Sequence, residues 1–495
     1  MWIDAWYNPS WVCEELFRRE IVLCSKGNHE NEIIDGKRKE EFALVELFKD
    51  YAKKKDLLLG SRLHTNILDK GLVEKNPYLA TTIISMYVKC GELAKARKVL
   101  DELPTRNVVS WAALIVGYVQ KGQMHQALTC FKRMQHEGHY ADAITLTCIL
   151  KACGNTQDIN TGKQIHDEIV RRMLLEKDIV LGTALVDMYA KCGAIVKAHE
   201  VLDILPIRNV VSWNALISGY AQKGNCNEAF NCFEQMQTEG ISPNIVSFVG
   251  ILKACSSTGA IDEGQRIHDV IVRGGFLEKS VVIGTALIDM YAKCGFLVKA
   301  QNLFDDLPIR NTVSWSALIS GYAHQGQGHE ALKCFDRMKR EGFPPDEVIF
   351  TSILKACGST GALEKGKLIH DEIASRVLLE KDILLGTALV DMYAKCGVPL
   401  KAQEVLEELP VRNDKSWCAL IAGYVQQGLC CEALDCYERM QSEGLTSDVV
   451  TLTCVLKACG ITGAIDKGKQ IHEDIVIRGS LKKDIMLGTA LVDMY

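Results

Sequence analysis

Apolar residues recur along most of this chain at intervals of three and four residues, the spacing that gathers them on one face of an α-helix. Two such stretches follow one another between 210 and 244. Their apolar positions are Val211, Trp213, Leu216, Ile217 and Tyr220, then Ala229, Phe230, Phe233 and Met236. Gly224, Gly240 and Pro243 stand where the stretches end, and glycine and proline are residues that terminate helices. The pattern therefore predicts a helical hairpin.

The hairpin pattern is part of a longer internal repeat. The Ser-Trp pair of Val108-Val109-Ser110-Trp111 returns at 212, 314 and 416, an offset of 102 residues each time. Lys-Ala-Cys keeps the same offset at 151, 253, 355 and 457. Each block divides into three hairpin units of 35, 36 and 31 residues. A fixed period of this length is typical of repeat architectures.

A single hairpin of this size cannot bury its own apolar face, so neighbouring hairpins must stack on one another. The sequence therefore predicts an all-α fold, a right-handed α-solenoid of stacked helix-turn-helix units. The thirteen complete units are 41–76, 77–107, 108–142, 143–178, 179–209, 210–244, 245–280, 281–311, 312–346, 347–382, 383–413, 414–448 and 449–484. Residues 1–40 form a non-repetitive N-terminal segment, and 485–495 begin a truncated fourteenth unit with one helix, which indicates a chain cut short.

Composition and charge exclude several classes of protein. With 48% hydrophobic and 24% charged residues, the chain is globular rather than disordered. No apolar run reaches the length of a membrane span, so we expect no membrane partner. The formal net charge of −5 argues against a strongly basic nucleic-acid binder, although a basic surface on an acidic body remains compatible with it.

The residues that most often carry chemistry have structural interpretations here. The 20 cysteines include no Cys-x-x-Cys pair, which favours reduced thiols packed in the core. Five repeat histidines occupy equivalent places, and we interpret them as packing or structural hydrogen-bonding groups: 64, 166, 268, 370 and 472. His166 and Glu168 match half of a zinc deaminase motif, but the Pro-Cys-x-x-Cys half is absent. We therefore predict no catalytic residue, no metal and no cofactor.

Two further features have both a structural and a functional interpretation. The repeat tryptophans 111, 213, 315 and 417 could stack on bases, but their place in the apolar stripe favours core packing. The run Lys53-Lys54-Lys55 is typical of a solvated turn, and a phosphate contact is its alternative.

The unit lengths and phrases of this chain resemble the pentatricopeptide repeat family, and more narrowly its P-L-S subclass of land plants. The phrases that carry the resemblance are Val210-Val211-Ser212-Trp213-Asn214-Ala215-Leu216-Ile217-Ser218-Gly219-Tyr220 and Gly284-Thr285-Ala286-Leu287-Ile288-Asp289-Met290-Tyr291. The resemblance implies sequence-specific binding of single-stranded RNA in a mitochondrion or chloroplast, one base per unit, without a small-molecule substrate. The subclass mostly serves cytidine-to-uridine editing, so an editing deaminase or editing factor acting in trans is the implied protein partner. No transit peptide is visible in residues 1–40.

In the family, the fifth and the last residue of a unit read one base together. Carried over to the 31-residue units, this rule gives Thr81/Asn107, Thr183/Asn209, Thr285/Asn311 and Thr387/Asn413, a combination that favours adenine. The 35-residue units give Ala112/Asp142, Asn214/Asn244, Ser316/Asp346 and Cys418/Asp448. Asn with Asn favours cytosine over uracil, Ser with Asp favours guanine, and units with Ala112 or Cys418 discriminate poorly. The 36-residue units are weak readers. The implied footprint is 5′-A-N-N-A-Y-N-A-G-N-A-N-N-3′, where Y is a pyrimidine.

Alternatives to RNA reading remain at this stage. The threonines could satisfy helix ends and the asparagines could lie in exit turns. A protein-interaction scaffold is the competing function, because protein-binding helical repeats have nearly the same period. The unequal lengths of the three units argue against it. A catalytic editing domain would have to lie outside these residues or in a partner.

Overall fold

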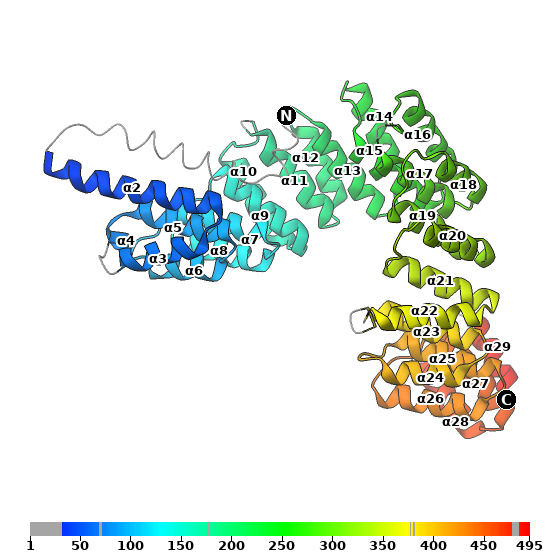
Figure 1. The fold of residues 1–495 in the computed structure, drawn as a ribbon. Helices are drawn as coiled ribbons and strands as arrows, with labels where there is room; N and C mark the ends of the chain where they lie inside the picture. The colour runs from blue at the N-terminus through cyan, green and yellow to red at the C-terminus, as the bar shows by residue number, and fades with distance from the viewer. Residues whose placement is uncertain are drawn as a thin grey trace. The chain divides into compact units, whose positions relative to one another are not determined.

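The computed structural model describes residues 32–68, 72–176, 178–278, 280–376, 378–379, 382–477 and 485–495; within these, the side chains of 32–40, 74 and 75 are not described. All of the secondary structure in these ranges is helical (Figure 1), which confirms the all-α prediction. Most of the non-repetitive segment 1–40, with Trp2, Trp6 and Trp11, lies outside the described residues. The same holds for the end of the unit 449–484.

The helices alternate along the chain between a first and a second helix of each hairpin. The first helices are α5 (Pro77–Cys90), α7 (Val108–Gln120), α9 (Ala143–Thr156), α11 (Ile179–Lys191), α13 (Val210–Gln222), α15 (Ile245–Thr258), α17 (Val281–Lys293), α19 (Thr312–His324), α21 (Glu347–Thr360), α23 (Ile383–Lys395), α25 (Asp414–Gln426), α27 (Val449–Thr462) and α29 (Ile485–Met494). Each begins at the first residue of a unit in the division drawn from the sequence.

The second helices differ in length between unit types. They are α6 (Leu93–Glu102), α8 (Met124–His136), α10 (Ile159–Arg171), α12 (Ile195–Ile204), α14 (Cys226–Thr238), α16 (Ile261–Arg273), α18 (Leu297–Asp306), α20 (Gly328–Arg340), α22 (Leu363–Ser375), α24 (Pro399–Glu408), α26 (Cys430–Ser442) and α28 (Ile465–Ile477). In the 31-residue units the second helix has 10 residues, whereas in the other units it has 13. The shorter second helix accounts for most of the difference in unit length.

The first repeat unit departs from the pattern of the others. It contains α2 (Glu32–Lys54), α3 (Leu57–Leu68) and the short α4 (Leu72–Lys75). α2 begins before the unit boundary that the sequence placed at 41. The run of three lysines lies at the end of α2, where Lys54 pairs with Asp50 at 2.8 Å.

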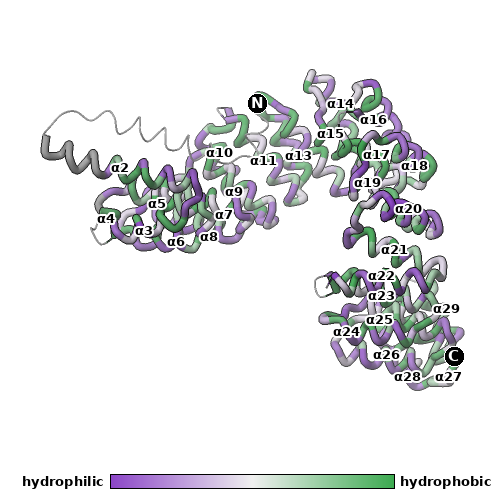
Figure 2. The backbone as a smooth tube through the Cα atoms, viewed as in Figure 1, coloured by the Kyte–Doolittle hydropathy of each residue, from purple (hydrophilic) through white to green (hydrophobic). Residues whose placement is uncertain are grey.

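The chain forms two bodies, residues 1–254 and 255–495, and each is an α-solenoid of stacked hairpins. Most helices carry both apolar and polar residues (Figure 2), whereas α7 is buried over most of its length. The first helices of successive hairpins pack on one another, as α7 does on α5 and α9. The repeat tryptophans 111, 213, 315 and 417 have no exposed surface, which confirms that they pack in the core. The turn of the hairpin 210–244 has Gly224 at φ +72°, a left-handed conformation that glycine adopts without strain.

Candidate nucleic-acid interface

The last residue of a unit has a defined place in the structure, because it caps the first helix of the next unit. After every 31-residue unit this residue is an asparagine in a capping box with the serine three residues later. The asparagine Oδ1 accepts a hydrogen bond from the serine backbone N–H: from Ser110 to Asn107 at 2.7 Å, from Ser314 to Asn311 at 2.8 Å. Since Oδ1 must face the helix, the amide NH₂ faces away from the capped end.

The fifth residue of the 31-residue units lies beside this amide. Asn209 Nδ2 is 3.3 Å from Thr183 Oγ1, and Asn413 Nδ2 is 3.2 Å from Thr387 Oγ1. In each of these two pairs, the threonine and the asparagine are 26 residues apart in the sequence and are linked by a hydrogen bond in the structure. For Thr81/Asn107 and Thr285/Asn311, no such bond occurs among the described residues.

The threonines also have a local structural role. Thr81, Thr183 and Thr387 donate to the carbonyl oxygen four residues earlier, at 2.8–2.9 Å. The buried Oγ1 of Thr285 is different, because it has no hydrogen-bond partner within the described residues. Capping and back-bonding therefore use part of the hydrogen-bonding capacity of these pairs, and a hydroxyl oxygen and an amide N–H remain available to a ligand.

In the 35-residue units, two of the four pairs are linked by a side-chain hydrogen bond. Asn214 Nδ2 donates to Asn244 Oδ1 at 3.1 Å, and Ser247 donates to Asn214 Oδ1 at 2.6 Å. Asp142 and Asp346 cap α9 and α21 through the backbone N–H groups of Thr145 and Ile349. Within the described ranges no hydrogen bond links Asp346 to Ser316, and Ala112 has no polar side-chain atom to offer.

The pair Cys418/Asp448 forms a small polar cluster with Thr451. The thiol lies 3.8 Å from Asp448 Oδ1, and the Thr451 hydroxyl contacts both side chains. Burial raises the pKa of Cys418 to about 11, so the thiol is neutral at physiological pH. Burial also opposes ionisation of Asp448, but hydrogen bonds from Thr451 outweigh it and hold the pKa of Asp448 below its ordinary value. Asp448 is therefore a charged acceptor.

Exposure of the fifth residues differs between the two bodies. Thr81, Ala112 and Thr183 are at most 1% exposed and Asn214 is 7% exposed, whereas Thr285, Ser316, Thr387 and Cys418 are half-buried. Among these eight positions, the fifth residue is therefore more accessible in the C-terminal body.

An exposed apolar side chain three residues before the fifth residue was not singled out from the sequence. At the second position of the units, Val180, Val246, Val282, Val313, Val348, Leu384, Val450 and Met486 are 46–68% exposed. Residues three apart on a helix are neighbours on its surface. Each of these side chains therefore offers an apolar surface next to the fifth position, which is polar in all of these units except that of Val246, where it is Val249. The recurrence of valine at this place in the printed sequence was the available signal.

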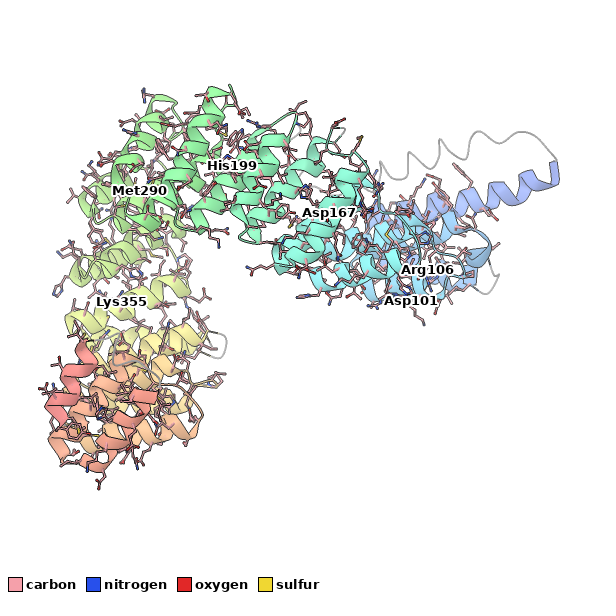
Figure 3. The ribbon with its side chains drawn as sticks, turned by 180° about the vertical axis from the view of Figure 1, so that it is seen from behind. Asp101, Arg106, Asp167, His199, Met290 and Lys355 are labelled. Atoms are coloured by element: carbon pink, nitrogen blue, oxygen red, sulfur yellow. The ribbon has the colours of Figure 1, made fainter. Side chains whose placement is uncertain are left out.

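Lysines lie one helical turn beyond the fifth position in the 36-residue units. Lys151, Lys253, Lys355 and Lys457 are exposed, and each follows the fifth residue by four positions, so it lies on the same helix face. Lys355, labelled in Figure 3, has its Nζ 3.1 Å from His324 Nδ1. Burial and the charge of Lys355 lower the pKa of His324. These lysines form a recurrent positive surface on a chain that is acidic as a whole.

The repeat histidines have structural partners. Nδ1 of His64, His166, His268, His370 and His472 lies 2.9–3.0 Å from the hydroxyl of Tyr87, Tyr189, Tyr291, Tyr393 and Tyr495. This confirms the interpretation as structural hydrogen-bonding groups. Within the described part of the chain, no group of three His, Cys, Asp or Glu side chains is placed to hold a metal ion. No helix in those same ranges is long and apolar enough to span a bilayer.

The cysteines of the described residues are free thiols, and most are buried. Burial raises the pKa of Cys153, Cys232, Cys334 and Cys357 to about 12. A thiol with a raised pKa is a poor nucleophile and a poor metal ligand.

Comparison with known proteins agrees with this arrangement. A model described as PPR repeat family matches residues 106–155, 208–257 and 310–359, and one described as PPR repeat matches 79–108, 285–311, 387–413 and 415–445. A chloroplastic pentatricopeptide repeat-containing protein of Arabidopsis thaliana is 36% identical over 409 residues, which cover 83% of this chain and 66% of the relative. A mitochondrial one from the same plant is 33% identical over 443 residues, 89% of this chain and 42% of the relative.

Another relative from Arabidopsis thaliana is 34% identical over 455 residues, 92% of this chain and 65% of its own length. The chain thus spans 42–66% of the length of these curated relatives. The crystal structure of the maize pentatricopeptide repeat protein PPR10 has a TM-score of 0.61 at 17% identity, over 98% of this chain and 72% of that chain. The same protein in complex with an 18-nucleotide psaJ RNA element has a TM-score of 0.66 at 17% identity and the same coverage, a likeness that establishes the shared fold. Together, the matched repeat models and these relatives show that the chain belongs to the pentatricopeptide repeat family.

Proposed function

We propose that the chain binds single-stranded RNA in a sequence-specific manner, with one base per repeat unit. The observation that carries the proposal is the contact between the fifth and the last residue of a unit, as in Asn209 with Thr183 and Asn214 with Asn244. Each contact gathers donors and acceptors whose orientation is fixed by a helix cap. A fixed polar pair of this size suits the Watson–Crick edge of an unstacked base.

The surroundings of each pair fit the rest of a nucleotide. An exposed aliphatic side chain such as Val282 or Val313 can contact the face of a base, because every base has an apolar face. Lysines such as Lys151 and Lys457 lie on the same helix face and can contact phosphates. Among relatives of the same fold, maize PPR10 has been crystallised with an RNA element, which supports the choice of ligand.

The base preferences follow the pairs. Asn with Thr offers an amide donor and a hydroxyl, and we propose adenine opposite Thr183/Asn209 and the three pairs like it. The pair Asn214/Asn244 prefers cytosine over uracil, and Ser316/Asp346 prefers guanine. Ala112 discriminates poorly because it has no polar group. Each good pair contributes on the order of 1–3 kcal/mol of discrimination, by analogy with bidentate base contacts.

The cellular role is a further part of the proposal. Relatives of this chain include proteins named as chloroplastic and as mitochondrial, so we propose an organellar RNA as the ligand. We also propose that the protein belongs to the P-L-S subclass and acts as an adaptor for cytidine-to-uridine editing or another processing step. It selects the site, and a partner supplies the catalysis.

Fluorescence anisotropy with RNAs built on the footprint tests the proposal. We expect the RNA with four adenines at the predicted places to bind about tenfold or more tightly than one with cytosines there. A DNA of the same sequence tests recognition of the sugar. Equal and weak binding of all of these nucleic acids would contradict the proposal and favour a protein-interaction scaffold.

A further inference from the structure

The first repeat unit leaves open several positions that every later unit of its length buries. Leu47 in α2 is 42% exposed, whereas the residue at the same place of the other 36-residue units has no exposed surface. Ala43 is exposed and Leu44 is half-buried, although the residues at their places in the other units are at most 5% exposed. These residues of the other units are Thr145, Leu146 and Ile149; Ser247, Phe248 and Ile251; Ile349, Phe350 and Ile353; and Thr451, Leu452 and Val455. A cluster of apolar side chains on a surface indicates an interaction site.

In the later units, this side of the hairpin is covered by the hairpin that precedes it. α9 packs against α7 and α8, which precede it, and against α10 and α11, which follow it. α2 packs against α3 and α5, both of which follow it, and no helix that precedes α2 lies within the described ranges. The open positions of α2 therefore correspond to the contact that α7 and α8 make with α9.

The second helix of the first unit extends the open surface. Leu59 in α3 is 44% exposed. At its place in a later unit, Lys365 forms an ion pair with Asp336 in α20, which belongs to the preceding hairpin. Leu59 therefore faces the same side as the open positions of α2, and an apolar side chain replaces a charged one there. We define the N-terminal apolar face as Ala43, Leu44, Leu47 and Leu59.

An amphipathic stretch precedes α2 in the sequence. Residues 9–26 carry apolar side chains at intervals of three and four, which a helix gathers on one face: Val12, Cys13, Leu16, Phe17, Ile21, Leu23 and Cys24. Asn8 and Pro9 are typical of a helix start, and Gly27 with Asn28 is typical of a helix end. The stretch lies outside the described residues, and its pattern predicts a helix over 9–26.

The short connection between this stretch and α2 limits where the predicted helix can lie. Residues 27–31 are five residues, a loop length that joins two antiparallel helices. Both helices rise about 1.5 Å per residue, so residues at equal distance from the middle of the loop come level with one another. Residues 12–16 thus come level with 42–46, beside the N-terminal apolar face.

Charge and tethering favour this stretch over a free partner. Arg18 and Arg19 come level with Glu40 and Glu41, so charges of opposite sign meet at the end of the contact that is nearer the loop. The short connection also holds the stretch near the face at an effective concentration of about millimolar order. A second copy of the chain would have to reach a comparable concentration to compete for the face.

We propose that residues 9–26 form a helix that docks on the N-terminal apolar face and caps the solenoid at its first unit. The cap occupies the side of α2 that α7 and α8 occupy on α9, and it buries Leu44, Leu47 and Leu59. The end of a solenoid needs such a cover, because an open apolar end promotes association between chains. The inference does not depend on RNA binding, so the two proposals can fail separately.

Hydrogen–deuterium exchange of the full chain, read by mass spectrometry, tests the cap. A helix of this length is marginal on its own in water, so protection of its amides requires docking. We expect the amides of 9–26 to exchange at least about tenfold more slowly in the full chain than in an isolated peptide of the same sequence. Leu16→Ser should abolish this protection and speed the exchange of 41–50. Val22→Ser, outside the apolar face of the predicted helix, is the matched control and should retain the protection of both segments.

A variant on the other side of the contact completes the test. Leu47→Ser should free residues 9–26 as Leu16→Ser does. Leu16 lies outside the repeat units, so any effect of its variant on 41–50 passes through the contact. Exchange of 9–26 in the parent chain at the rate of the isolated peptide would overturn the proposal, and so would protection that survives both substitutions. A dimer in analytical ultracentrifugation that Leu47→Ser converts to a monomer, with 9–26 unprotected, would show that a second copy covers the face instead.

Discussion

At the residue scale, the repeat histidines show how a side chain that could act in catalysis or metal binding has a structural role instead. His166 is 8% exposed, and its Nδ1 lies 2.9 Å from the Tyr189 hydroxyl. The ring joins the second helix of a 36-residue unit to the first helix of the next unit. Burial lowers the pKa of His64, His166, His268 and His370, because a buried imidazolium loses hydration. The neutral ring is therefore the form that the folded chain favours.

This burial predicts a loss of stability in mild acid. Because the folded-state pKa lies below the unfolded value of about 6.5, the unfolded chain binds protons first as the pH falls. Stability from these histidines is present above the unfolded pKa and is lost as the pH falls through the lowered folded pKa. We expect the urea midpoint to fall between pH of about 7 and about 5, and to fall less in His166→Gln. His125→Gln, at an exposed position, is the control and should keep the full decrease.

Substitutions at a capping asparagine should separate the effect on folding stability from the effect on RNA binding. Asn209→Ala removes the capping box with Ser212, and we expect a loss of about 1 kcal/mol in unfolding free energy together with weaker RNA binding. Asn209→Asp retains a cap and should retain stability, but it should move base preference at one position away from adenine. Denaturation and anisotropy on the same two variants check this. If Asn209→Asp binds every base variant as the parent does, Asn209 does not read a base.

The sequence predicted these pairs through family resemblance but not their state in the folded chain. The spacing of the repeat placed Thr183 at the fifth and Asn209 at the last position of one unit, and in the structure a hydrogen bond links their side chains. Thr81 and Thr183 are almost completely buried, whereas Thr285 and Thr387 are half-buried, although the four residues hold equivalent places in the repeat. Their position in the repeat therefore does not reveal their exposure.

At the element scale, the first helices are spaced by small residues. A methyl group added at Gly423 of α25 would lie 2.7 Å from the Cβ and 3.1 Å from the Cα of Ala394 on α23. Gly219 meets Ala190 on α11 in the same way. Periodicity in the sequence predicted which helices exist and where they begin, whereas the start of α2 at Glu32 lay outside the repeat and was not predicted. The role of these glycines likewise emerged only from the packing.

This contact predicts opposite effects for two glycine substitutions. Gly423→Ala should destabilise the chain by about 1–3 kcal/mol, because the new methyl group would lie only 2.7 Å from the Cβ of Ala394, which is attached directly to the backbone and has no rotamer that moves it aside. Gly488→Ala in α29 meets no atom within 4 Å and should be neutral or stabilising by up to about 1 kcal/mol, through helix propensity. Thermal denaturation of both variants checks this. Equal effects would show that helix propensity, not packing, dominates at Gly423.

At the scale of the whole molecule, the net charge of −5 conceals an uneven distribution. Exposed lysines follow the fifth position at 151, 253, 355 and 457, and Lys191, on the first helix α11, pairs with Asp187 at 2.7 Å. Many ion pairs also join second helices or the turns that follow them. Arg106, after α6, pairs with Glu137, at the end of α8, at 2.7 Å. Arg106 also donates a hydrogen bond to the carbonyl oxygen of Asp101, and the two residues lie close together in Figure 3. The acidic net charge therefore does not prevent positive charge from recurring beside the fifth positions of the 36-residue units.

The salt dependence of RNA binding measures that surface directly. Each lysine that neutralises a phosphate of a single strand contributes about 0.7 to the slope of log K against log salt. We expect a modest slope for the parent chain, and a decrease of about one or less for each of Lys151→Ala and Lys457→Ala, with base preferences retained. Lys197→Ala, on the second helix α12 and paired with Glu200, should leave the slope unchanged. A slope that is unaffected by the first two substitutions would place the phosphates elsewhere. A steep slope in the parent would show that the net charge is a poor guide to this family member's electrostatics.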